Sequence, residues 1–99
     1  MPTYIALVNW TDEGIRNVKA MLERTERVEQ LAEKHGARLE QTYWTIGPYD
    51  IVAILEASDE ESAAAFALEL GSMGNVRTTT LRAYNREAMS RIIEKLGPS

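Results

Sequence analysis

The residue pair best suited to chemistry is Tyr49-Asp50, which directly follows Gly47-Pro48. A phenol beside a carboxylate could bind or protonate a carbonyl substrate in a cleft. Asp50 could instead accept hydrogen bonds from the N–H groups of a hairpin or a helix end, with Tyr49 packed in the core. We favour this structural role, and we expect Gly47 to contribute backbone geometry only.

The sole histidine and three further aromatic residues extend the set of candidates. His35 stands at an expected helix end, where a cation is favoured, so a surface role is preferred. Trp10, Tyr43 and Trp44 could line a pocket for an aromatic or polyketide-like ligand. They could also anchor an interface, which we prefer because Trp and Tyr dominate such surfaces. The candidate ligand-binding residues are therefore Tyr49, Asp50, His35, Trp44 and Trp10.

Neither a metal nor a cofactor is expected. The chain contains one histidine and no cysteine, and it lacks the H-x-x-x-H and H-E-x-x-H spacings of metal sites. The absence of cysteine also removes disulfides, thiolate nucleophiles and iron–sulfur clusters from consideration.

Composition predicts one globular domain over residues 1–99. Hydrophobic residues make up 44% and charged residues 26%, which is ordinary for a soluble chain. Eleven basic against fifteen acidic residues give a net charge of −4, which argues against binding nucleic acid. No apolar run approaches the ~18–20 residues that span a bilayer, and the N-terminus lacks the features of a signal peptide. We therefore expect no membrane contact and a cytoplasmic location.

The pattern of apolar residues and turn signals predicts the order βαββαβ followed by a last helix. Thr11 and Asn85 are expected N-caps, and Ser58-Asp59-Glu60-Glu61 is a capping-box pattern before the second helix. The apolar stripe of the first helix slips around its axis, which predicts a kink near Arg24-Thr25-Glu26. Strands are expected at 3–10, 37–46, 49–57 and 75–84.

This order predicts an α+β fold of ferredoxin-like type, with an antiparallel sheet in the order 4-1-3-2 and an extra C-terminal helix. The strands at 3–10 and 49–57 are apolar on both faces, as central strands should be, whereas those at 37–46 and 75–84 carry many polar residues. Two crossover helices cover one face only. The other face must be covered by a second copy of the chain, or by the last helix folding back across its own sheet, and we favour self-association.

Several motifs resemble the signature of the GYD-domain family. These are Gly47-Pro48-Tyr49-Asp50 after Tyr43-Trp44-Thr45-Ile46, Asn9-Trp10-Thr11 running into Gly14-Ile15, Arg27, and Gly74-Asn75-Val76-Arg77. The resemblance extends over about residues 3–84 and leaves the last helix outside. It implies a dimeric α/β-barrel arrangement and little about activity. Some proteins of that arrangement bind haem, which leaves ligation by His35 open, and relatives often carry a proline near positions 23–26, which this chain lacks.

The leading functional hypothesis is a small homo-oligomeric protein that binds a small organic molecule or acts as an accessory or structural module. The alternative is a cofactor-independent isomerase, cyclase or monooxygenase acting on an aromatic or polyketide-like substrate. An enzyme requires a cleft of ~300 Å3 or more with convergent polar groups. In that case Tyr49, Asp50 or His35 should point into the space between sheet and helices.

Overall fold

The structure is a computed structural model that describes residues 1–98. Its four strands form one sheet in the order β2-β3-β1-β4, with every neighbouring pair antiparallel. The predicted ferredoxin-like topology is therefore confirmed. The strands are β1 (Thr3–Trp10), β2 (Ala37–Trp44), β3 (Ile51–Ala57) and β4 (Val76–Ala83).

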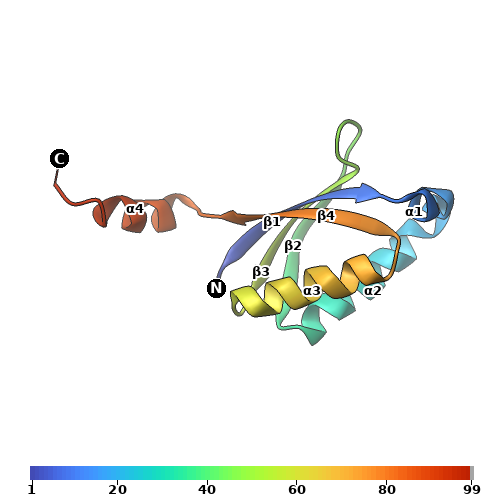
Figure 1. The fold of residues 1–99 in the computed structure, drawn as a ribbon, viewed down its shortest axis with the longest axis horizontal. Coiled ribbons are helices and arrows are strands. Elements are labelled where there is room, and N and C mark those ends of the chain that lie inside the picture. Colours follow the sequence, from blue (N-terminus) through green and yellow to red (C-terminus); the bar gives the residue numbers. More distant parts are fainter. Residues whose placement is uncertain (99) are drawn as a thin grey trace.

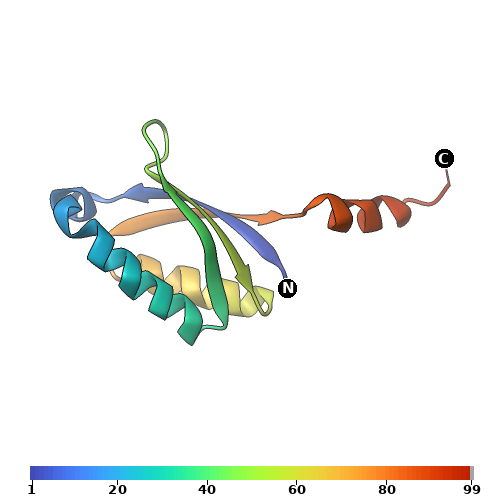
Figure 2. The same cartoon turned by 180° about the vertical axis from the view of Figure 1, so that it is seen from behind.

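The two long helices lie side by side on one face of the sheet (Figures 1 and 2). They are α2 and α3, the crossover helices of the two βαβ halves. No helix in the described part of the chain is both long enough and apolar enough to cross a membrane. The helices are α1 (Asp12–Arg16), the 3₁₀ turn η1 (Val18–Ala20), α2 (Met21–Lys34), α3 (Glu60–Ser72) and α4 (Arg86–Glu94).

The first helical region breaks earlier than predicted. The α-helix ends at Arg16 and resumes at Met21 after η1, whereas residues 24–26 lie inside the continuous helix α2. The Thr25 hydroxyl donates to the carbonyl of Met21 within α2. The Arg24 guanidinium donates to the carbonyls of Asn17 and Gly14. Both carbonyls also accept backbone N–H groups, from Ala20 and Asn17 respectively, so Arg24 adds a second donor to each and ties α2 to the end of α1.

The predicted caps are largely confirmed. Thr11 accepts the N–H of Gly14, and Asn85 accepts the N–H of Ala88. The cap of α3 differs by one residue from the capping-box pattern, because Asp59 rather than Ser58 accepts the N–H of Ser62. The hydrogen bonds from Ser62 lower the pKa of the Asp59 carboxyl.

The strands that flank the hairpin are each two residues shorter at that end than expected. β2 ends at Trp44 and β3 begins at Ile51, although the Thr45 N–H still donates to the carbonyl of Asp50. The chain leaves the ladder because Gly47 adopts a positive φ of 148° and Pro48 has no N–H to donate.

The core between the sheet and the two long helices is built mainly from small side chains. Alanine provides six of its ten buried members, including Ala32 and Ala57, which are completely inaccessible. Small residues allow helices to approach a sheet closely, and the larger members fill the remaining space. The buried set is Tyr4, Ala6, Val8, Ala32, Ala37, Ala53, Leu55, Ala57, Ala63 and Phe66.

The opposite face of the sheet is apolar and carries no helix of the described chain (Figures 1 and 2). Side chains alternate between faces along a strand, so the residues between the buried ones on β1 and β3 point to this side. We call this surface the open face. Its apolar members are Ile5, Leu7, Val52 and Ile54, all partly exposed, with Tyr43 and Leu81 on the flanking strands.

The last helix does not fold back across its own sheet. Figure 1 shows α4 projecting beyond the end of β4, away from both the sheet and the α2–α3 layer. Its apolar stripe, which Leu96 continues just beyond the helix end, is exposed, with Met89 46%, Ile93 54% and Leu96 79% accessible. The projecting helix gives the molecule its longest dimension of 54 Å. The fold-back alternative for covering the sheet is therefore wrong.

Candidate functional site

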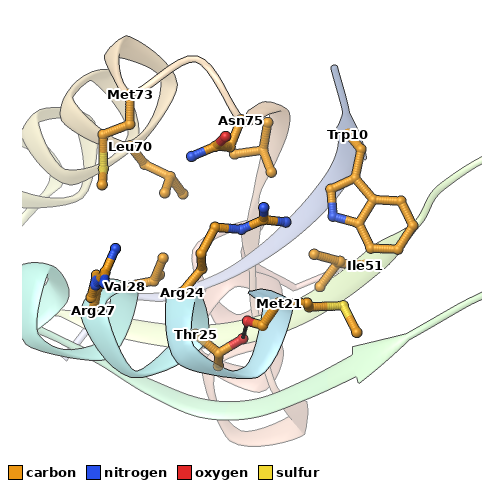
Figure 3. A pocket seen from close by; sticks show the side chains of 11 residues that line it. Trp10, Met21, Arg24, Thr25, Arg27, Val28, Ile51, Leu70, Met73 and Asn75 are labelled. Atoms are coloured by element: carbon orange, nitrogen blue, oxygen red, sulfur yellow. Dashed lines mark hydrogen bonds between the residues drawn. The ribbon is translucent and has the colours of Figure 1, made fainter. Parts of the chain in front are cut away.

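A cavity of about 100 Å3 opens between the sheet and the helices α2 and α3. The end of β1 and the loop before β4 form its rim, and the inner sides of the helices form its walls (Figure 3). Hydrophobic side chains provide most of the lining. The lining residues are Trp10, Met21, Arg24, Thr25, Arg27, Val28, Ile51, Leu70, Met73, Asn75 and Val76.

A second cavity of about 90 Å3 lies deeper over the middle of the sheet. Its walls include Ala6 and Ala53 on the sheet and Phe66 on α3, and it has almost no polar surface. The two cavities share five wall residues and therefore adjoin each other, one at the rim and one toward the core, and we call the two together the apolar path. The shared residues are Thr25, Val28, Ile51, Leu70 and Val76.

The polar groups of the outer cavity are cationic or neutral. Figure 3 shows Arg24 and Arg27 on neighbouring turns of α2, with Leu70 and Met73 on α3 opposite them. Arg24 is held by the two carbonyls described above, whereas Arg27 makes no hydrogen bond or ion pair with any residue from 1 to 98. Asn75 adds an amide at the rim. No carboxylate lines this cavity, although acidic residues outnumber basic ones in the chain.

The Gly47-Pro48-Tyr49-Asp50 hairpin is attached to the end of β1. The Trp10 N–H donates to Oδ2 of Asp50 over 2.9 Å, and the Asp50 N–H donates to the Val8 carbonyl over 2.8 Å. The Asn9 side-chain amide donates to the Pro48 carbonyl over 2.8 Å. These contacts hold the backbone of Trp10, and so position its indole at the cavity rim.

The opposite side of the rim is fixed by a close approach between α1 and the loop before β4. The Thr11 hydroxyl donates to the Gly74 carbonyl over 2.6 Å, and the Thr11 N–H donates to the Asn75 carbonyl over 3.1 Å. A Cβ atom at Gly14 would stand 2.0 Å from that same Asn75 carbonyl oxygen. Glycine is therefore the residue type that lets α1 begin at this point.

His35 lies at the far end of α2, where it links the two long helices. Its Nε2 stands 3.0 Å from Oε1 of Glu69 on α3, and Lys34 Nζ stands 3.2 Å from the same oxygen. The hydrogen bond from His35, followed by that from Lys34, lowers the pKa of the Glu69 carboxyl. Glu69 is about one-third exposed, so this cluster is a surface contact between helices.

The structure separates the candidate residues that the sequence indicated. Trp10 lines the cavity, whereas Tyr49, Asp50, Trp44 and His35 are absent from its walls. Asp50 acts on the site indirectly, through the backbone of Trp10. Trp44 lies on the edge strand β2 and is 40% exposed.

Other wall residues were not identified as site residues from the sequence. Arg24, Thr25 and Asn75 reach the cavity because the helical break falls at 17–20 and brings the start of α2 beside the loop before β4. The available signal was the spacing of Arg24, Arg27 and Val28, which share one side of a helix at 3.6 residues per turn. Leu70 and the C-cap residue Met73 have the same three-residue separation at the end of α3.

The cavity walls can therefore provide apolar contact and positive charge, but they bring no carboxylate or histidine together with another proton-transfer group. Nor do residues 1–98 contain a group of three or more His, Cys, Asp or Glu side chains placed to hold a metal ion. The arrangement suits binding better than acid–base chemistry.

Relatives of known name provide an independent comparison. The chain is 40% identical over 84 residues to a Thermus thermophilus protein named "Glutamine synthetase and cystathionine beta-lyase binding protein", and the match covers 84% of this chain and 88% of that protein.

Solved structures also share the fold. An FFRP crystal structure superposes with a TM-score of 0.62 at 20% identity, covering 85% of this chain and all of that one, which demonstrates a common fold only. A crystal structure of a Thermus thermophilus protein gives a TM-score of 0.53 at 25% identity, with 87% and 100% coverage.

The GYD domain model matches residues 4–93. The match extends through most of α4, so the expectation that the last helix lies outside the family pattern is wrong. Because the match covers nearly the whole described chain, this protein belongs to the GYD family.

Proposed function

We propose that this protein is a homodimeric accessory module that binds another protein. Two copies stack through their open faces, and the resulting dimer docks onto a larger partner. The relative named for binding glutamine synthetase and cystathionine β-lyase supports a role of this kind and suggests a metabolic enzyme as the partner.

The open face is the observation that carries the proposal. Ile5 and Leu7 on β1 lie beside Ile54 and Val52 on β3, and this apolar centre has no cover from the chain's own helices. Monomeric proteins rarely expose a contiguous apolar patch beyond a few hundred Å2. A second copy offers an identical apolar surface, and stacking sheet on sheet would bury both.

The projecting helix α4 is the proposed contact for the enzyme partner. Met89, Ile93 and Leu96 form an apolar stripe, while Arg86, Glu87 and Arg91 make the helix polar elsewhere. Helices with a single apolar stripe commonly dock into grooves of other proteins. Because α4 points away from its own domain, this stripe is accessible to a partner.

The cavity geometry supports this binding function over the enzymatic alternative. Neither cavity between the sheet and the helices reaches the ~300 Å3 typical of small-molecule active sites, and Tyr49, Asp50 and His35 all lie outside their walls. His35 lines a larger hollow of about 520 Å3 beside Lys34 and Asp59, but that hollow is an open depression of the surface. An isomerase, cyclase or monooxygenase would need such groups beside its substrate.

Self-association is tested by light scattering at micromolar concentration. The wild-type chain should scatter as a dimer, and Ile54→Lys should scatter as a folded monomer because it places a charge in the centre of the open face. Gln30→Lys, which adds the same charge on the exposed side of α2, should remain dimeric. A monomeric wild-type protein, or a dimeric Ile54→Lys variant, would contradict the proposed interface.

Partner binding is tested with purified glutamine synthetase and cystathionine β-lyase from the organism that encodes this chain. At least one enzyme should co-elute with the wild-type dimer in size-exclusion chromatography. Ile93→Ser, which changes only the exposed stripe of α4, should lose co-elution while keeping the dimer, and Ser90→Ala should retain both. Failure of both enzymes to bind at tens of micromolar would remove the assigned partner class.

A further inference from the structure

We propose that the cavity between the sheet and the helices α2 and α3 binds a small monocarboxylate with an apolar body, whose carboxylate is held by Arg27 and Asn75. This inference goes beyond the proposed docking function and does not depend on dimer formation, because every residue that carries it belongs to one chain. It rests on three observations: the charge of the rim, the shape of the apolar path and the state of the two arginines.

The rim charge selects an anion. Two arginines line the outer cavity and no acidic residue does, in a chain of net charge −4. Arg24 already donates to two backbone carbonyls, which satisfy N–H groups but do not neutralise its charge. Arg27 has no partner among residues 1–98, so its fork of N–H donors is available for a carboxylate.

The apolar path selects the body of the ligand. Behind the arginines, Val28, Leu70 and Val76 continue from the outer cavity into the inner one, where Phe66 and Ala53 close the space. An empty cavity of ~150 Å3 in another protein holds a benzene ring. The volumes here, about 100 Å3 and about 90 Å3, suit an unbranched chain or one ring.

Figure 3 shows how the polar groups lie around the outer cavity. The Asn75 amide lies at the rim near the Arg24 guanidinium, and Arg27 stands on α2 facing Leu70 and Met73 of α3. A carboxylate at the rim would receive N–H groups from Arg27 and Asn75, while its carbon chain would contact only apolar atoms. Trp10 borders the same rim and can report on occupancy.

Binding is tested by the fluorescence of Trp10 in a Trp44→Phe background, which leaves one tryptophan in the chain. Hexanoate and phenylacetate are the probes, with hexan-1-ol as the uncharged analogue and inorganic phosphate as the anion without a body. At least one of the two acids should bind saturably, and more tightly than hexan-1-ol, while phosphate alone should not change the emission.

Arg27→Gln should weaken binding of the acid by about tenfold to a hundredfold, the range for a lost charge-assisted hydrogen bond, and leave hexan-1-ol unchanged. Arg91→Gln on α4 is the matched control and should have no effect. Both arginines are exposed, so neither change should impair folding, and circular dichroism checks this.

Three results would overturn the inference. They are no saturable response to either acid up to millimolar concentration, equal binding of acid and alcohol, and acid binding that is unchanged by Arg27→Gln. A dimer that forms normally while any of these results holds would leave the proposed docking function intact, so the two proposals can fail separately.

Discussion

The two faces of the sheet differ in the size and the exposure of their apolar side chains. The face under the helices is lined by small side chains, with Ala6, Ala53 and Ala57 among its most buried positions. The open face carries the larger aliphatic residues, such as Leu7 and Ile54, and leaves them partly exposed. Hydrophobicity alone would place the larger side chains inside, because burial stabilises in proportion to apolar area.

The difference follows from what covers each face. Small residues under α2 and α3 let the helices approach the strands, but they leave the inner cavity unfilled. Large residues on the open face form a broad surface that suits a second sheet at ~10 Å separation. The covered face is therefore specialised for an internal space, and the open face for an external contact.

Truncating one leucine on each face should give the largest difference in stability between the two faces. Leu55→Ala, at 3% exposure on the covered face, should lower the free energy of unfolding by ~2–5 kcal/mol through lost contacts and a new void. Leu7→Ala on the open face should cost a dilute monomer about 1 kcal/mol or less, because its side chain is already partly hydrated. Urea unfolding at low and high protein concentration measures both. Equal losses of unfolding free energy for the two variants at low concentration, where the protein is monomeric, would contradict this difference between the two faces.

The hairpin attachment should have the next largest effect. Asp50→Ala removes the acceptor of the Trp10 N–H, which should destabilise the fold by ~1–3 kcal/mol. Asp50→Asn keeps an acceptor oxygen and should recover much of this loss, and Asp12→Ala on the exposed start of α1 is a neutral control. Thermal unfolding followed by circular dichroism measures the effect. An unchanged melting temperature for Asp50→Ala would contradict this structural role of the Asp50 carboxylate.

A smaller change should reveal the unfilled space on the covered face. Ala53→Val adds two methyl groups to a wall of the inner cavity, and we expect stabilisation by ~0.5–1 kcal/mol, as for other cavity-filling changes. The same variant should weaken binding of hexanoate, because its carbon chain would lose room. Thr79→Val, which lies on the open face outside both cavities, should leave hexanoate binding unchanged. Destabilisation by Ala53→Val would indicate that the site is already fully packed.

The smallest expected effect concerns acid pH. The folded-state pKa of Glu69 is lowered by His35 and Lys34, so its contribution to stability is present above the unfolded-state pKa. It is lost as the pH falls through the lower folded-state value. Glu69→Gln should therefore reduce stability slightly at neutral pH and flatten the fall below about pH 4.5. The urea midpoint at pH 7 and pH 3 tests this, and an identical pH profile for the variant would contradict it.

Much of the fold follows from the sequence because strand periodicity and caps are local signals. Two-sided apolar patterns identified β1 and β3 as the central strands, and Thr11 and Asn85 identified helix starts. The break in the first helical region was misplaced because its cause is tertiary. Gly14 packs on Asn75, and Arg24 reaches back to the end of α1. Neither contact has a signature in the phase of the apolar stripe.

The site was harder to predict for a related reason. Tyr49 and Asp50 stand out by residue type, yet the cavity walls belong to residues brought together by the packing of α2, α3 and the loop before β4. Trp10 is the one candidate on those walls, and its position depends on Asp50 through a backbone hydrogen bond. The residue types of Tyr49 and Asp50 indicated where the hairpin is attached to the rest of the fold. The cavity is formed by segments that are distant in sequence, so only their packing revealed it.

Alanine residues line the sheet side of the inner cavity, which leaves the size of this cavity free to change. Its dimensions depend on methyl groups that make no hydrogen bonds, whereas its preference for a charge depends on side chains at the entrance. Over evolutionary time, a single added carbon could resize the cavity without touching the groups that select its occupant. The size of the cavity and its preference for a charged ligand thus depend on different residues, and each can change without the other among relatives.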